Sequence, residues 1–212
     1  MAARTMLRSR FTYWAMTCGW LTAALAGFAV MINRDVTPGE TADAPGAYPR
    51  EALGPAAADR PTLMMFAHPR CPCTSASLSE LRQVLQTCPG AADLRIYFRT
   101  PATESADWTQ TALWKEAASL CGVTLVADPD GAVARHCGVR TSGHVLLYGT
   151  DGKLRFSGGI TAARGHAGET SGRSAVVAIL SDGSDVGRRS ETFGCPLFDK
   201  EMCRKEETCC PP

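Results

Sequence analysis

The feature that most constrains this chain is an uninterrupted apolar stretch near its N-terminus. Residues Tyr13 to Ile32 include no charged side chain. A helix rises 1.5 Å per residue, so a helix over this stretch is about 30 Å long, the thickness of the hydrocarbon core of a bilayer. A buried helix of a soluble protein usually keeps one polar face, and this stretch has none. The sequence therefore predicts one transmembrane helix over residues 13–32.

The charges on either side of this segment predict its orientation. Arg4, Arg8 and Arg10 precede it, whereas Arg34 follows it with Asp35 alongside. Cytoplasmic flanks carry an excess of Lys and Arg. We therefore expect residues 1–12 in the cytoplasm and the rest of a single-pass inner-membrane protein in the periplasm.

A cleaved signal peptide is the alternative reading of the same segment. Ala24-Leu25-Ala26 has the small-x-small pattern of a cleavage site. The apolar stretch is longer than a usual signal-peptide core, which favours an uncleaved anchor.

Composition divides the rest of the chain into three parts. Residues 33–59 are rich in proline and alanine and show no hydrophobic periodicity, which predicts a linker. Residues 60–183 carry alternating strand and helix patterns, and residues 184–212 form a cysteine-rich tail. A net charge of +1 indicates no nucleic-acid partner.

Hydrophobic periodicity predicts a mixed sheet flanked by helices, an α/β fold. Strands alternate with helices at first, which favours parallel pairing, and a hairpin around Thr150-Asp151-Gly152 then adds antiparallel strands. The predicted strands are Thr62–His68, Leu94–Phe98, Val123–Ala127, Val145–Tyr148 and Leu154–Ser157, and the predicted helices are Ser75–Gln86, Trp108–Leu120, Val133–Cys137 and Arg173–Leu180.

Two sequence runs resemble the thioredoxin-like superfamily. FAHPRCPCTSASLSEL resembles its first strand, active-site turn and helix, and ADPDGAVARHCGVRTSGHVLLYGTDGKLRFSGG is similar to the second half of membrane-tethered thiol–disulfide oxidoreductases. The resemblance covers about residues 60–181 and implies that Cys71 is the nucleophile. HPRCPCT, Arg164-Gly165-His166 and FGCPLF most resemble RedB-like membrane proteins.

The chain departs from the superfamily pattern in three places. The usual C-x-x-C is here Cys71-Pro72-Cys73, and the cis-proline of the superfamily corresponds to Gly143. A non-proline cis bond costs about 2.5–4 kcal/mol, so we expect a trans bond there. A buried carboxylate that thioredoxins use as a proton carrier corresponds to Met65. These departures leave open a noncatalytic thioredoxin-fold interaction module.

The two cysteines of the turn are the predicted catalytic pair. A helix N-terminus stabilises a thiolate, the species that attacks disulfides. The expected supporting residues are His68, Arg70, Pro72, Ser142, Gly143 and His144. The predicted function is a thiol–disulfide oxidoreductase that acts on protein thiols or disulfides and needs no cofactor.

The remaining cysteines leave a metal-binding alternative open. The chain has ten cysteines, and one of them, Cys18, lies in the apolar segment. The number outside that segment is therefore odd, so those cysteines cannot all form disulfides with one another. We expect Cys88, Cys121 and Cys137 to be structural. The tail cysteines suggest either disulfides or a soft metal such as copper or zinc, with His144 as a further ligand for a copper chaperone; they are Cys195, Cys203, Cys209 and Cys210.

Overall fold

The computed structural model describes residues 2–102, 108–184 and 189–198. It contains two compact units, one up to Thr37 and one from Pro38 onward. The first unit is helix α1 (Ala2–Val36), of which Tyr13–Val36 is long and apolar enough to cross a membrane. A signal sequence near the N-terminus can meet the same criteria of length and composition. The predicted apolar helix is therefore present, and it continues beyond Ile32.

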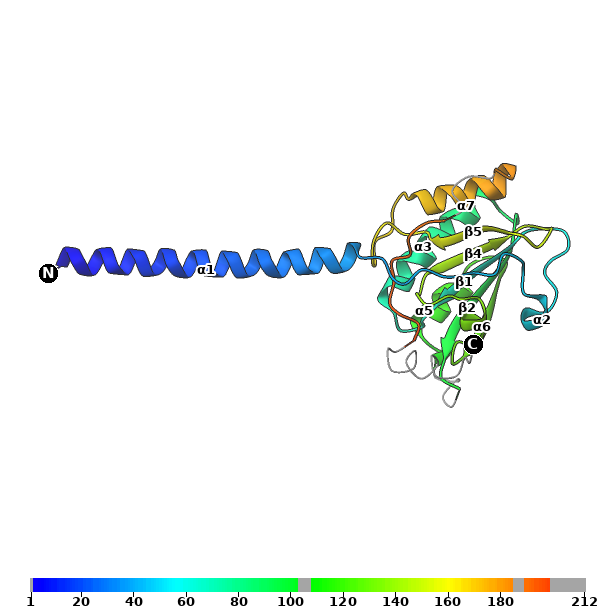
Figure 1. The fold of residues 1–212 in the computed structure, drawn as a ribbon, viewed down its shortest axis with the longest axis horizontal. Coiled ribbons are helices and arrows are strands. Elements are labelled where there is room, and N and C mark those ends of the chain that lie inside the picture. Colours follow the sequence, from blue (N-terminus) through cyan, green and yellow to red (C-terminus); the bar gives the residue numbers. More distant parts are fainter. Residues whose placement is uncertain (1, 103–107, 185–188, 199–212) are drawn as a thin grey trace, which may run out of the picture. The chain divides into compact units, whose positions relative to one another are not determined.

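The second unit is built on one five-stranded sheet. Its strands are β1 (Thr62–Ala67), β2 (Asp93–Thr100), β3 (Val123–Pro129), β4 (His144–Tyr148) and β5 (Leu154–Gly159), in the order β3-β2-β1-β4-β5 (Figure 1). β1, β2 and β3 are parallel, while β4 is antiparallel to both β1 and β5. This confirms the predicted mixed sheet.

β1 is the central strand and leads directly to the cysteines. All its residues are buried, because helices cover one face of the sheet and other segments cover the opposite face. Phe66 pairs with Tyr97 on one side and with His144 on the other. Met65 is fully buried in the core, as expected for an apolar residue at this position.

Three helices pack on one face of the sheet: α3 (Pro72–Thr87), α5 (Ala112–Ala118) and α7 (Ser171–Asp182). α3 begins at Pro72, earlier than predicted, because Cys71 is its N-cap and proline suits the first helical position. α5 is shorter than the predicted Trp108–Leu120. It begins where the Thr111 hydroxyl accepts a hydrogen bond from Trp114 N–H.

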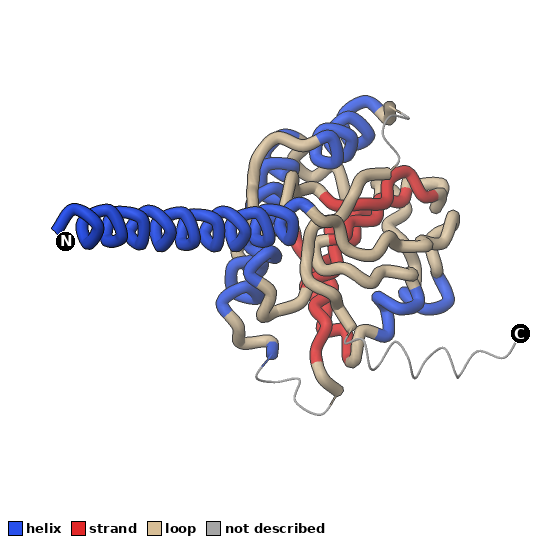
Figure 2. The backbone as a smooth tube through the Cα atoms, turned by 60° about the vertical axis from the view of Figure 1, so that its left-hand side comes forward, coloured by secondary structure: helices blue, strands red, loops and turns tan. Residues whose placement is uncertain are grey.

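The opposite face carries α6 (Ala132–His136) and mostly loop backbone, which Figure 2 shows on the other side of the sheet from the larger helices. Part of the predicted linker lies here and includes α2 (Arg50–Leu53). Tyr48 is buried, and its N–H donates a 2.7 Å hydrogen bond to Gly152 O. The segment from residue 38 is thus packed against the domain, because its tyrosine and alanines cover apolar sheet residues.

Candidate functional site

Cys71 lies at the amino end of α3. The turn after β1 is closed by a hydrogen bond from Cys71 N–H to His68 O (3.1 Å), and Thr74 N–H donates to Cys71 O (3.0 Å). Pro72 fixes the backbone of the first helical residue and leaves no competing N–H. The positive end of the helix dipole therefore faces the thiol, which favours its ionised form.

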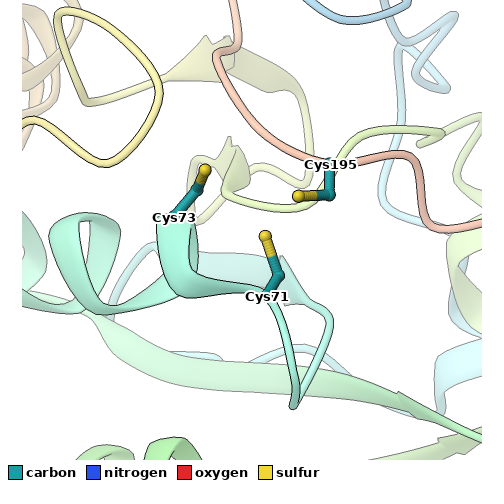
Figure 3. A group of neighbouring side chains, drawn as sticks. All are labelled: Cys71, Cys73 and Cys195. Carbon is teal, nitrogen blue, oxygen red and sulfur yellow. The ribbon is translucent and has the colours of Figure 1, made fainter. Parts of the chain in front are cut away.

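Three cysteine sulfurs gather at this point (Figure 3). The Sγ atoms of Cys71, Cys73 and Cys195 all lie within 4.8 Å of one another. Cys71 and Cys73 project from the start of α3, and Cys195 approaches from residues 194–198, here called the C-terminal segment. Cys71 is 3% exposed and Cys73 is 8% exposed. The sequence brings the first two together by spacing, but the third arrives only through the tertiary fold.

The C-terminal segment is paired with the loop that precedes β4. Ser142 N–H donates to Cys195 O (2.9 Å), and Leu197 N–H donates to Arg140 O (2.8 Å). Thr141 and Pro196 form an antiparallel bridge between these two hydrogen bonds. The guanidinium of Arg164 donates to Gly194 O. Leu197 and Phe198 are buried at the end of the segment, so backbone pairing and packing both fasten it.

The same loop is tied to the cysteine turn through Ser142 and Gly143. Ser142 Oγ accepts from His68 N–H (3.0 Å) and lies 3.1 Å from Thr74 Oγ1. Gly143 N–H donates to Phe66 O (2.7 Å), and no peptide bond among the described residues is cis. Gly143 has φ of 88°, and a Cβ there would lie 2.7 Å from Ser77 Oγ. The backbone conformation therefore favours glycine, and a larger residue would also have to displace the Ser77 hydroxyl.

The three thiols differ in acidity. Burial raises the pKa of Cys71, but hydrogen bonds from Cys195 and Cys73 outweigh it and leave the pKa below its ordinary value. Burial and the neighbouring Cys71 charge raise the pKa of Cys73. Burial, followed by interactions with Cys71 and Cys73, raises the pKa of Cys195 to about 12. Cys71 is therefore the thiol that ionises first.

His68 and Arg70, two of the expected supporting residues, both belong to the turn between β1 and α3. His68 Nδ1 accepts a hydrogen bond from Arg70 N–H (3.2 Å), and its ring packs edge-on against Trp108. The Arg70 guanidinium lies 4.1 Å from the centre of the Trp108 ring. Both residues shape the turn beside Cys71, and Arg164 is the cation that lowers the pKa of Cys73.

His144, an expected supporting residue and a possible copper ligand, is enclosed by the fold. It is buried at the start of β4, with Nδ1 2.8 Å from Thr192 Oγ1 and Nε2 3.0 Å from Ser157 Oγ. Both ring nitrogens are thus engaged by hydroxyls. Burial lowers the pKa of His144 to about 4, so the imidazole is neutral near pH 7.

Within the second unit, Cys88, Cys121 and Cys137 do not belong to the three-sulfur cluster. Cys88 is buried, with its sulfur 3.2 Å from Ser181 Oγ, and Cys137 is fully buried. Both agree with a structural role, whereas Cys121 is exposed and has no such packing. Cys203, Cys209 and Cys210 lie outside the described residues. The FGCPLF motif is the sequence signal that could have placed Cys195 near the cysteine turn, because this motif and HPRCPCT resemble segments of the same RedB-like proteins.

The order and direction of the strands, with a cysteine turn between β1 and α3, define a thioredoxin-like fold. No protein-family model and no curated protein matches the sequence.

Several solved structures are similar to the chain. A hypothetical protein from Sinorhizobium meliloti is 21% identical with a TM-score of 0.52, and the match covers 76% of this chain and 94% of that one. An uncharacterized conserved protein from Geobacillus kaustophilus is 16% identical with a TM-score of 0.53, covering 78% and 93%. A secreted disulfide oxidoreductase of Mycobacterium tuberculosis is 16% identical with a TM-score of 0.40, covering 57% and 81%. At these identities the likeness concerns the fold alone.

Proposed function

We propose that this protein is a membrane-anchored thiol–disulfide oxidoreductase that uses Cys71 and Cys73. The observation that carries the proposal is the position of Cys71 as N-cap of α3, with the Cys73 sulfur within 4.8 Å of its own. A thiol at a helix N-terminus is stabilised as the thiolate, and a second thiol within reach can resolve a mixed disulfide.

The proposed reaction is a two-electron exchange with a partner protein. The Cys71 thiolate attacks one sulfur of a partner disulfide, forms a mixed disulfide and releases the other sulfur as a thiolate. Cys73 loses its proton to solvent and attacks the Cys71 sulfur, which releases the partner's second thiolate and leaves a Cys71–Cys73 disulfide. The partner is reduced and this protein oxidised. The reverse sequence oxidises a partner dithiol.

Access to Cys71 requires movement of the C-terminal segment. Cys71 is almost entirely buried, and Cys195 lies against it. Two backbone hydrogen bonds join residues 195 and 197 to the loop before β4. We therefore include an opening of this segment in the proposed reaction, since an attacking sulfur must reach the partner disulfide directly.

The location of the domain belongs to the same proposal. Helix α1 serves as an uncleaved anchor, and the arginines that precede its apolar part keep the N-terminus cytoplasmic. The domain then faces the periplasm, a compartment in which disulfide chemistry operates. The resemblance of HPRCPCT and FGCPLF to RedB-like membrane proteins supports this assignment.

The experiment is an exchange assay with the full chain in detergent. The reduced protein is mixed with a disulfide-containing protein substrate, and the disulfides transferred are counted by mass spectrometry. We expect Cys71→Ser to abolish exchange and Cys73→Ser to accumulate a mixed disulfide at Cys71. Cys88→Ser is the matched control, because Cys88 is also buried but packs against Ser181, and it should retain exchange. Undiminished exchange in Cys71→Ser would disprove the proposal.

A further inference from the structure

We propose that Cys71, Cys73 and Cys195 form a three-thiolate site for Cu(I). The site shares two sulfurs with the proposed exchange reaction but does not depend on that reaction. Its third ligand, Cys195, takes no part in the exchange mechanism described above.

The spacing of the sulfurs suits one small ion. A planar three-coordinate metal with bonds of about 2.3 Å to sulfur needs sulfurs about 4 Å apart. The three Sγ atoms lie within 4.8 Å of one another, and they converge on a common space (Figure 3). Small side-chain rotations are enough to bring all three into bonding distance.

The chemistry of the donors favours Cu(I) over Zn(II). Thiolates are soft ligands that select Cu(I), zinc or iron–sulfur clusters. Structural zinc sites are almost always four-coordinate, and the buried imidazole of His144 already has hydrogen-bond partners at both ring nitrogens. His144 uses both ring nitrogens on Thr192 and Ser157, and His68 Nδ1 accepts from Arg70 N–H. Three sulfurs without an imidazole are a complete set for monovalent copper.

The surroundings offset the charge that such a complex carries. Three thiolates and one Cu(I) have a net charge of −2. The amino end of α3 offers positive dipole charge beside Cys71, and the Arg164 guanidinium donates to the carbonyl oxygen of Gly194, the residue before Cys195. Burial of Cys71 and Cys73 also limits contact of the ion with solvent.

The ligand set spans two distant parts of the chain, which gives binding a structural consequence. Cu(I) would bond the C-terminal segment to the start of α3, in addition to the hydrogen bonds from Ser142 and Leu197. Each thiol that binds as a thiolate releases its proton. Because the same sulfurs carry out exchange, bound Cu(I) would also block thiol–disulfide exchange.

The test measures Cu(I) affinity of the full chain by competition with a chromogenic Cu(I) chelator under anaerobic, reducing conditions. The starting protein carries Cys203→Ser, Cys209→Ser and Cys210→Ser, so that these tail thiols cannot bind the ion. We expect one Cu(I) per chain and three sulfur neighbours at about 2.3 Å by X-ray absorption. Adding Cys195→Ser should weaken binding at least 100-fold, whereas Cys88→Ser should leave it unchanged. Circular dichroism confirms that each variant folds.

The outcomes separate this proposal from the proposed function. Unchanged affinity in Cys195→Ser, or fewer than three sulfur neighbours, would overturn the copper site. Exchange activity is measured on the same metal-free samples, and its reacting sulfurs are those of Cys71 and Cys73. If the protein exchanges disulfides but fails the copper test, only the copper site is disproved. If it binds Cu(I) through three sulfurs but does not exchange disulfides, only the proposed function is disproved.

Discussion

The backbone N–H of Ser142 donates a 2.9 Å hydrogen bond to the carbonyl oxygen of Cys195. Ser142 precedes β4, while its Oγ accepts from His68 N–H in the cysteine turn. One residue thus links the C-terminal segment to the turn that carries Cys71. We infer from this arrangement that the attachment of residues 194–198 to the domain controls access to the proposed catalytic pair.

Weakening that fastening should expose Cys71. Leu197 is buried at the end of the C-terminal segment, and Leu197→Ala removes packing worth about 2 kcal/mol or more. If the closed state loses all of this free energy relative to the open state, the fraction of molecules with the C-terminal segment open rises roughly 30-fold. We expect the alkylation rate of Cys71 to rise by a similar factor. The rate is measured by mass spectrometry of the peptide that contains Cys71.

The matched control is Leu81→Ala. Leu81 is equally buried but packs on the opposite face of the sheet, against the larger helices. This variant should lose stability while its alkylation rate stays close to that of the wild type. Equal acceleration in both variants would mean that Cys71 becomes accessible only by general unfolding.

His144 should make the domain sensitive to mild acid. In the folded protein its pKa is lowered to about 4 by burial, whereas in the unfolded chain it is near 6.5. Between these pH values the unfolded state binds more protons than the folded state. The free energy of unfolding is therefore undiminished by His144 above about pH 6.5 and falls as the pH drops towards 4. The loss amounts to about 3 kcal/mol. Denaturant titrations from pH 7 to pH 4 should show a smaller loss in His144→Gln, and identical pH profiles would refute this assignment.

A buried ion pair joins α3 to α7. Glu80 is 0% exposed; Oε2 lies 2.6 Å from Arg173 Nη1, and Oε1 accepts from Gly168 N–H (2.7 Å). Arg173→Met leaves the carboxylate buried and unpaired, which should lower the free energy of unfolding by about 3 kcal/mol.

The exposed pair of Arg155 and Asp151 is the control for this variant. Arg155→Met breaks a 2.9 Å contact between partly exposed side chains and should cost less than about 1 kcal/mol. The two variants are compared by chemical denaturation under identical conditions. Similar losses in both would show that burial adds nothing to the Glu80–Arg173 pair.

Helix α1 should hold the full chain in the membrane. We expect the protein to stay in the membrane fraction after alkaline carbonate extraction, and its N-terminal residues to be found by mass spectrometry. Leu25→Arg places a charge in the apolar part of the helix and should weaken insertion by about 2.5–3.5 kcal/mol. A mature protein that begins at Gly27 would instead identify the segment as a signal peptide.

The predictable part of the fold is the part that depends on local patterns. The short apolar runs, the helix periodicity after the cysteine turn and the Thr150-Asp151-Gly152 turn predicted the five strands and most helices to within a few residues. The start of α3 was predicted too late, at Ser75. In the structure the helix begins at Pro72, with Cys71 as its N-cap, and Glu80 in its second half binds Arg173 of α7.

The sequence by itself determined the apolar anchor candidate, the order of the elements and the adjacency of Cys71 and Cys73. Each of these follows from residues that are neighbours along the chain. Only the tertiary structure placed Cys195 beside that pair, packed the region from residue 38 onto the sheet and enclosed His144 between Thr192 and Ser157. These contacts join segments that are far apart in the chain, and they form because the two faces of one sheet must be covered, a condition that no local pattern encodes.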